Sequence, residues 1–221
     1  MALDGVILDI DGTLVLSNDI HAHAWVEAFA SQGYEVEFDQ VRSLMGMGSD
    51  QVLPQLVPDL SKATEPGKTI ASRHTELVLT KYRPQLKPTA GARPLVQKLL
   101  EAGLKVVIAT SASPEELDTM LKVAEIDDFQ LEATTSSDAD NSKPAPDIVE
   151  ATLQKTQLAP ERQIMLADTP YDIEAASRAG VAVIALRCGG FSDDDLAGAI
   201  AIYDHPADLL HHYDQSPLGQ R

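Results

Sequence analysis

Short aliphatic runs alternate with helical patterns along most of this chain. Runs suited to buried strands occupy residues 6–10, 104–109, 164–167 and 181–186, and weaker ones occupy 129–133 and 199–203. Apolar residues at helical spacing predict helices over 93–102, 146–156 and 171–179. Strands that alternate with helices in this way predict a parallel sheet with helices on both faces, which is an α/β fold.

The interval between the first two strong strands breaks this rhythm. It holds roughly ninety residues, whereas a crossover between parallel strands needs only about 12. Helical patterns over 18–32, 38–45, 49–56 and 68–81 fill it, and no segment of it clearly predicts a strand. We therefore predict an all-helical cap over 15–84, inserted into a Rossmann-like, doubly wound core over 1–14 and 85–221. Because the cap follows the first strand directly, we expect it to overhang the end of that strand as a lid.

Composition and charge exclude several classes of partner. The 221 residues include 34 acidic and 17 basic side chains, which give a formal charge of −17. This charge repels polyanions, and no basic cluster offsets it. No apolar run approaches the ~18 residues of a membrane span, and the N-terminal residues lead straight into a strand. We expect a cytoplasmic monomer or homodimer that binds neither nucleic acid nor membranes and ends in a flexible tail over 216–221.

Two carboxylates end the first strand. Asp9 and Asp11 follow the aliphatic run and are followed at once by Gly12 and Thr13. Ligands of open α/β sheets gather outside the carboxyl ends of the strands. Like charges so close together need a cation, a proton or a positive side chain between them, so at least one pKa should be perturbed. The alternative is an ordinary turn rich in Asp and Gly.

Polar side chains also follow the later strands. Each has an ordinary explanation as a helix cap or a solvated helix start, but together they predict one site, because parallel strands end at the same edge of a sheet. Hydroxyls and a lysine suit phosphate, and carboxylate oxygens suit Mg²⁺ rather than zinc. The residues are Thr110 and Ser111 after the second strand, Lys143 after the third, and Asp168 and Asp172 after the fourth.

These motifs resemble those of a known superfamily. The segments Asp9-x-Asp11-Gly12-Thr13, Thr110 or Ser111, Lys143-Pro144 and Asp168-Thr169-x-x-Asp172 are similar, in the same order, to the four motifs of the haloacid dehalogenase superfamily. The helical insertion resembles the C1 cap of the branch that contains phosphoglycolate phosphatase and β-phosphoglucomutase. The resemblance implies a Mg²⁺-dependent phosphatase of a small phosphate ester.

The resemblance also implies a role for each motif. Asp9 is the nucleophile that forms an aspartyl-phosphate, and Asp11 is the general acid and base, which requires Asp11 to hold a proton while Asp9 stays ionised. Thr110, Ser111 and Lys143 bind the phosphoryl oxygens. The implied ligands of Mg²⁺ are Asp9, the backbone carbonyl of Asp11, and Asp168, with Asp172 either as a further ligand or as a partner of the ligands.

The cap is expected to select the substrate. The flexible loop Gly46-Met47-Gly48-Ser49 corresponds to the specificity loop of similar proteins, and its alternative is a plain helical connection. His21 matches a histidine of the phosphoglucomutase relatives. His21 and His23 are two residues apart and cannot face one ligand from one helix, so a paired metal site is not expected. His74, His205, His211 and His212 are expected on solvated surfaces.

Two other functions remain as alternatives. Phosphomutases tend to carry a basic cap residue that holds a second phosphate. The loop from Gly46 to Ser49 has no basic residue, although Arg73 is a candidate for that role, so hydrolysis is the favoured prediction. A receiver-type phospho-acceptor module also joins aspartates, a hydroxyl and a lysine on an α/β sheet. It is a remote alternative, because such modules lack a large insertion after the first strand.

Overall fold

The protein, described by a computed structural model over residues 3–220, is built around one parallel sheet. The strand order is β3-β2-β1-β4-β5-β6, and every neighbouring pair is parallel. All six predicted strands are present, which confirms the doubly wound α/β fold. The strands are β1 (Gly5–Leu8), β2 (Lys105–Ala109), β3 (Glu132–Thr134), β4 (Gln163–Ala167), β5 (Ala182–Leu186) and β6 (Ala201–Tyr203).

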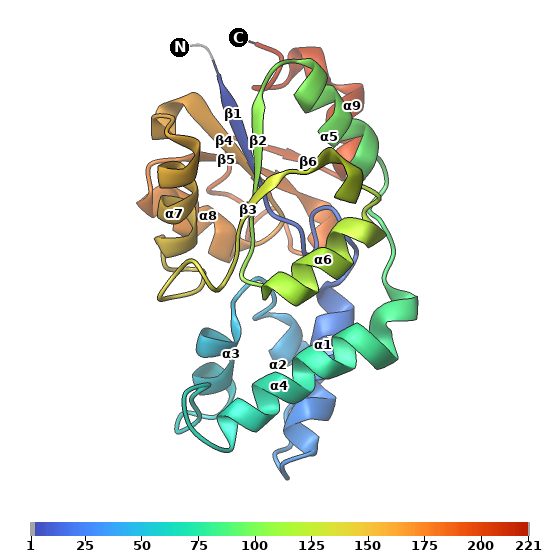
Figure 1. Cartoon of the computed structure of the whole chain (residues 1–221), viewed down its shortest axis with the longest axis vertical. Helices are drawn as coiled ribbons and strands as arrows, with labels where there is room; N and C mark the ends of the chain where they lie inside the picture. The colour runs from blue at the N-terminus through green and yellow to red at the C-terminus, as the bar shows by residue number, and fades with distance from the viewer. Residues whose placement is uncertain (1–2, 221) are drawn as a thin grey trace.

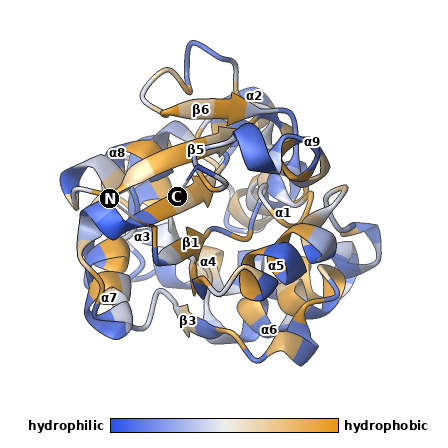
Figure 2. Cartoon of the chain, turned by 90° about the horizontal axis from the view of Figure 1, so that it is seen from above, coloured by the Kyte–Doolittle hydropathy of each residue, from blue (hydrophilic) through white to orange (hydrophobic). Residues whose placement is uncertain are grey.

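Helices cover both faces of the sheet. Figure 1 shows α7 and α8 against one face and α5 and α9 against the other, and the view from above in Figure 2 agrees. Each helix turns its apolar side inward, as α5 does with Leu95, Val96 and Leu99. The helices are α5 (Ala92–Glu101), α6 (Pro114–Val123), α7 (Asp147–Thr156), α8 (Pro170–Arg178) and α9 (Pro206–His211).

The long insertion is helical, as predicted, and lies beyond the carboxyl ends of the strands (Figure 1). The helix predicted over 38–45 is shorter than expected, because the chain turns after Arg42 toward Gly46, whose φ is +107°. The insertion contains the α-helices α1 (Asn18–Ala30), α2 (Phe38–Arg42), α3 (Ser49–Leu56) and α4 (Gly67–Leu77). A π-helical turn, η1 (Val78–Tyr82), and a 3₁₀ turn, η2 (Arg83–Gln85), follow α4.

The central strands are buried almost completely, and Figure 2 shows them as a hydrophobic layer between the two sets of helices. Ile7 and Leu8 on β1 have no exposed surface, because helices cover both faces of a parallel sheet. The chain end also joins the core. Ser216 and Leu218 are fully buried, so the prediction of a flexible tail is wrong for them, and Arg221 lies outside the described residues.

None of the helices in the described part of the chain combines the length and the apolar character needed to cross a membrane.

Candidate active site

Three buried carboxylates meet where β1 and β4 end. Asp9 is 5% exposed, and Asp168 and Asp172 are not exposed at all. One carboxylate oxygen from each lies within 4.8 Å of the other two. The meeting follows from strand pairing, since β1 and β4 are neighbours in register and the Asp9 N–H donates to the carbonyl of Leu166 at 2.9 Å. We call Asp9, Asp168 and Asp172 the acidic cluster.

Lys143 is the positive side chain that contacts this cluster. Its Nζ lies 2.5 Å from Oδ1 of Asp9 and 2.6 Å from Oδ1 of Asp172, and it also donates to the carbonyl of Ala109 at 3.1 Å. The side chain is 1% exposed. Burial opposes the charge, but Asp172 and Asp9 raise the pKa of Lys143 above its usual value. Lys143 is therefore a fixed cation between two of the three acids.

The single positive charge of Lys143 does not balance the negative charges of three carboxylates. The pKa values of Asp168 and Asp9 are both raised. Burial raises the pKa of Asp168 to about 7, and Asp172 adds to the effect. Burial also raises the pKa of Asp9 well above its usual value, although Lys143 opposes the shift. A further cation would relieve this excess negative charge, and a donor set made of oxygen atoms fits Mg²⁺.

Two other side chains orient Asp168. The Thr13 hydroxyl donates to its Oδ1 at 2.7 Å, and the Asn18 amide donates to its Oδ2 at 2.8 Å and to the carbonyl of Gly189 at 3.0 Å. Thr13 belonged to the first motif but had no assigned role, and Asn18 gave no signal in the sequence because its partner is 150 residues away.

Asp11 has a different environment from Asp9. Its Oδ1 accepts a hydrogen bond from Ser17 at 2.7 Å and lies 3.0 Å from Nε2 of His21. Burial would raise the pKa of Asp11, but His21 and the Ser17 hydroxyl lower it overall. Asp11 in turn raises the pKa of His21 against the effect of burial. Without a metal cation in the acidic cluster, the pKa of Asp9 is thus raised and that of Asp11 lowered, which is opposite to the order that the predicted general-acid role of Asp11 requires. That role stays a prediction.

A cavity of about 440 Å³ opens above these acids. The buried hydroxyl of Ser111 has no hydrogen-bond partner among the residues that the structure describes, and the Thr110 hydroxyl accepts from the N–H of Ala112 at 3.0 Å. This turn therefore has polar groups available to an anion. Asp168, Asp172 and Lys143 are buried and are not among the lining residues. The predicted residues that line the cavity are Asp9, Asp11, His21, Gly46, Met47, Gly48, Ser49, Thr110 and Ser111.

Arg73 is not one of the lining residues, contrary to its predicted role in the cap. Its guanidinium pairs with Glu76 at 2.8 Å and lies 3.9 Å from Glu27. Lys62 lines the cavity instead and lies 3.6 Å from Asp50. Lys62 stands in an irregular polar segment without periodicity, so no pattern in the sequence pointed to it.

The expected surface position of His74 is also wrong. His74 is 7% exposed, lines the cavity and stacks on Trp25 with ring centroids 4.1 Å apart. Burial lowers the pKa of His74 well below its usual value. Its spacing from Ile70 and Leu77, which are buried on the same helix, is the signal that places it on the inner face of α4.

Known proteins are similar to this chain over most of its length. A profile of the family described as haloacid dehalogenase-like hydrolase matches residues 6–186. The chloroplastic protein SUPPRESSOR OF QUENCHING 1 of Arabidopsis thaliana is 30% identical over 191 residues. These residues are 84% of this chain but only 18% of that much longer protein. A phosphorylated carbohydrates phosphatase of Thermotoga maritima is 24% identical over 214 residues, which cover 95% of this chain and 97% of that one.

Solved structures share the fold. A hydrolase from Pseudomonas syringae is 26% identical and matches with a TM-score of 0.89, over 96% of this chain and 98% of that chain. The β-phosphoglucomutase of Clostridium difficile is 17% identical and matches with a TM-score of 0.82, over 96% of each chain. The second likeness concerns the fold alone.

Proposed function

Because this chain belongs to the haloacid dehalogenase-like hydrolases, we propose that it is a Mg²⁺-dependent phosphatase that hydrolyses a small phosphorylated metabolite through an aspartyl-phosphate. The match to this family and the similarity to a phosphatase of Thermotoga maritima identify the chain as an enzyme of the phosphatase type. The same findings overturn the alternative of a receiver-type signalling module. One observation carries the mechanism that we propose. A buried aspartate paired with a buried lysine lines the cavity beside two hydroxyl groups.

Asp9 is the proposed nucleophile. Its carboxylate attacks phosphorus, the bond from phosphorus to the ester oxygen breaks, and water later releases phosphate from Asp9. Lys143 supports this role because it holds Oδ1 of Asp9 at 2.5 Å. Within the described part of the chain, Oδ2 then has only a long contact of 3.4 Å, from the Thr13 hydroxyl. Thr110, Ser111 and Lys143 are proposed to bind the phosphoryl oxygens, where negative charge gathers in the transition state.

Asp11 is the proposed general acid and base. It lines the cavity near Asp9, where it can protonate the departing alkoxide and then take a proton from the attacking water. The pKa of Asp11 is lowered, and the imidazole of His21, whose pKa is raised and whose Nε2 lies 3.0 Å away, is a titratable partner that can supply the first proton. The pair of Asp11 and His21 is therefore proposed to act together in the proton transfer.

The proposed holders of Mg²⁺ are Asp9, the backbone carbonyl of Asp11, and Asp168, with Asp172 as a ligand or as the group that positions Lys143. Their oxygen donors and excess negative charge support this assignment. When bound, Mg²⁺ supplies positive charge that polarises the phosphoryl group.

The cavity supports a small substrate. Its volume of about 440 Å³ accommodates a metabolite but not a folded phosphoprotein. Helices of the predicted cap over 15–84 supply Trp25, Ala71, Ser72 and Thr75 to the lining. The mixture of apolar surface and hydroxyl groups suits a polyol or sugar phosphate. We propose that this part of the chain selects the leaving group, together with the loop from Gly46 to Ser49.

One observation favours the alternative of a phosphomutase. Lys62 is a basic side chain in the lining of the cavity, and a mutase needs such a group to hold a second phosphate. The loop from Gly46 to Ser49 offers no basic residue, and Arg73 is paired elsewhere. Because Lys62 lies 3.6 Å from Asp50, whose charge opposes its own, hydrolysis remains the favoured proposal.

A panel of small esters tests both functions. Phosphate release would be measured with phosphoglycolate, hexose 6-phosphates and β-glucose 1-phosphate, with Mg²⁺ and with a chelator, while glucose 6-phosphate formation is followed. Release that needs Mg²⁺ is the expected result. Isomerisation without release would establish the mutase instead, and the absence of both reactions with every ester would contradict the proposal.

A further inference from the structure

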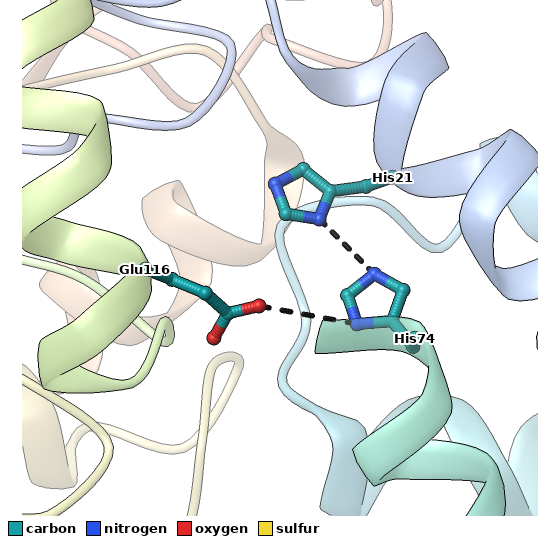
Figure 3. Close-up of side chains that lie close together, drawn as sticks. All are labelled: His21, His74 and Glu116. Carbon is teal, nitrogen blue, oxygen red and sulfur yellow. Dashed lines mark hydrogen bonds and ion pairs between the residues drawn. The ribbon is translucent and has the colours of Figure 1, made fainter. Parts of the chain in front are cut away.

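A second group of possible metal ligands lies beside Asp11 and shares no member with the acidic cluster. His21 comes from α1, His74 from α4 and Glu116 from α6, and their side chains point toward one another (Figure 3). One nitrogen of each ring and one oxygen of the carboxylate lie within 4.8 Å of one another. All three side chains line the cavity, so a small ion has access to them from that side.

We propose that His21, His74 and Glu116 form a second metal site, which binds a first-row transition metal ion such as Zn²⁺ and joins α1 and α4 to α6. Two imidazoles and one carboxylate are the ligands of open zinc sites, in which a water or a ligand takes the fourth position. The acidic cluster offers oxygen atoms alone and suits Mg²⁺. The two sites therefore differ in the metal that they select.

The geometry of the rings fits such an ion. Nδ1 of His21 lies 3.1 Å from Nε2 of His74, and two nitrogens of a tetrahedral zinc site are about 3.3 Å apart. Without a metal these two nitrogens share a hydrogen bond, and an ion would replace its proton. The Glu116 Oε1 lies 4.0 Å from the other nitrogen of His74, Nδ1, so the carboxylate or the His74 ring must turn for all three ligands to meet one ion (Figure 3).

The surroundings of the three ligands support a built site. The other nitrogen of His21 bonds to Asp11 at 3.0 Å, which leaves Nδ1 for the ion, as in the carboxylate–histidine pairs around zinc. Trp25 fixes the ring of His74 by stacking at an interplanar angle of 15°. Glu116 is held through its Oε2, which accepts from the N–H of Ser113 at 3.0 Å and from its hydroxyl at 2.7 Å.

Binding of Zn²⁺ by calorimetry tests this site without any need for turnover. Excess Mg²⁺ is present throughout to occupy the acidic cluster. We expect one Zn²⁺ per wild-type chain and a loss of affinity of more than about tenfold in both His74→Gln and Glu116→Gln. Glutamine at 116 can still complete the capping box of α6, so this variant is expected to fold. Co²⁺ gives a second readout, because an open tetrahedral site produces intense visible absorption.

Two histidine variants are matched controls. His23→Gln lies on the same helix, but its ring contacts Phe38 with centroids 4.5 Å apart. His212→Gln removes a surface histidine that lies 3.0 Å from Asp208 and next to His211. Both are expected to bind Zn²⁺ like the wild type. No binding to the wild type, unchanged binding in both His74→Gln and Glu116→Gln, or loss in His212→Gln would overturn the proposal. A failure of the proposed phosphatase activity would leave this measurement unaffected.

Discussion

At the scale of single residues, the environment separates side chains of the same type. Asp9 and Asp11 are two positions apart, yet the pKa of Asp9 is raised, chiefly by burial, while the pKa of Asp11 is lowered, because His21 and Ser17 outweigh its burial. The environment also distinguishes Lys143 from the surface lysines, because its side chain is 1% exposed and pairs with two carboxylates. These contacts underlie the first two predictions.

Asp9→Asn is expected to lower kcat for phosphate release by at least about a thousandfold, because an amide cannot attack phosphorus as a carboxylate does. Steady-state phosphate release with Mg²⁺ measures the effect. Circular dichroism serves as the control for folding. Turnover close to that of the wild type would show that Asp9 is not the nucleophile.

Lys143→Met is expected to destabilise the metal-free protein by about 3–5 kcal/mol, because it leaves the buried acids without their cation. Urea unfolding in the presence of a chelator measures the free energy of unfolding. Lys122→Met is the matched control. It breaks an exposed ion pair with Asp118, 2.7 Å long, and is expected to cost less than about 0.5 kcal/mol. Equal costs for the two variants would contradict the central position of Lys143.

At the scale of elements, the helix N-termini link the fold to the site. Ser113 and Glu116 form a capping box at the start of α6, and Thr169 caps α8 by accepting from the N–H of Asp172 at 3.2 Å. Each cap satisfies helix N–H groups and at the same time fixes a carboxylate near the cavity. The sequence pattern that ends a strand and starts a helix therefore also orients the polar side chains.

Ser113→Ala is expected to lower the free energy of unfolding by about 1 kcal/mol, because it removes the acceptor for the N–H of Glu116. Chemical denaturation measures the loss. Ser31→Ala at an exposed helix end is the control, since its hydroxyl only donates to the carbonyl of Ala28, and a change within about 0.5 kcal/mol is expected. A neutral Ser113→Ala would mean that the box contributes little.

At the scale of the whole molecule, electrostatics couples the metal to stability. The chain carries a formal charge of −17, and its most buried acids meet between the two halves of the sheet, at the ends of β1 and β4. Cation binding to ionised carboxylates stabilises the native state alone, so the gain must depend on pH.

The gain in Tm from Mg²⁺ is expected to be larger at about pH 8 than at about pH 5. Without metal the pKa of Asp168 is raised to about 7, so the stabilisation that comes from its protonated form is present at low pH and is lost as the pH rises through about 7. Mg²⁺ must displace that proton at low pH but not at high pH. Thermal unfolding with Mg²⁺ and with a chelator measures the gain at each pH. The Asp168→Asn variant is expected to lose most of the gain in Tm from Mg²⁺. An equal gain at both pH values in the wild type would contradict the assignment of Asp168 as a metal ligand.

The sequence by itself determined the architecture and the edge of the sheet at which the polar side chains gather. Aliphatic runs and helical periodicity are local patterns, and parallel strands end at one edge whatever the details of packing, so Asp9, Thr110 and Asp168 could be assigned to one site in advance. The helical nature of the insertion followed from the same periodicity.

The tertiary structure alone decided which cap residues face the cavity and how charge is distributed. Lys62, rather than Arg73, lines the cavity, and His74 meets His21 across 53 residues of chain. The raised pKa of Asp9 also depends on its burial and on the charges of Lys143 and Asp172, which are remote in the sequence. These features depend on contacts between separate elements. Helical spacing indicates the inner face for His74 but not which residue it meets there, because burial and distance are set only when the elements pack together.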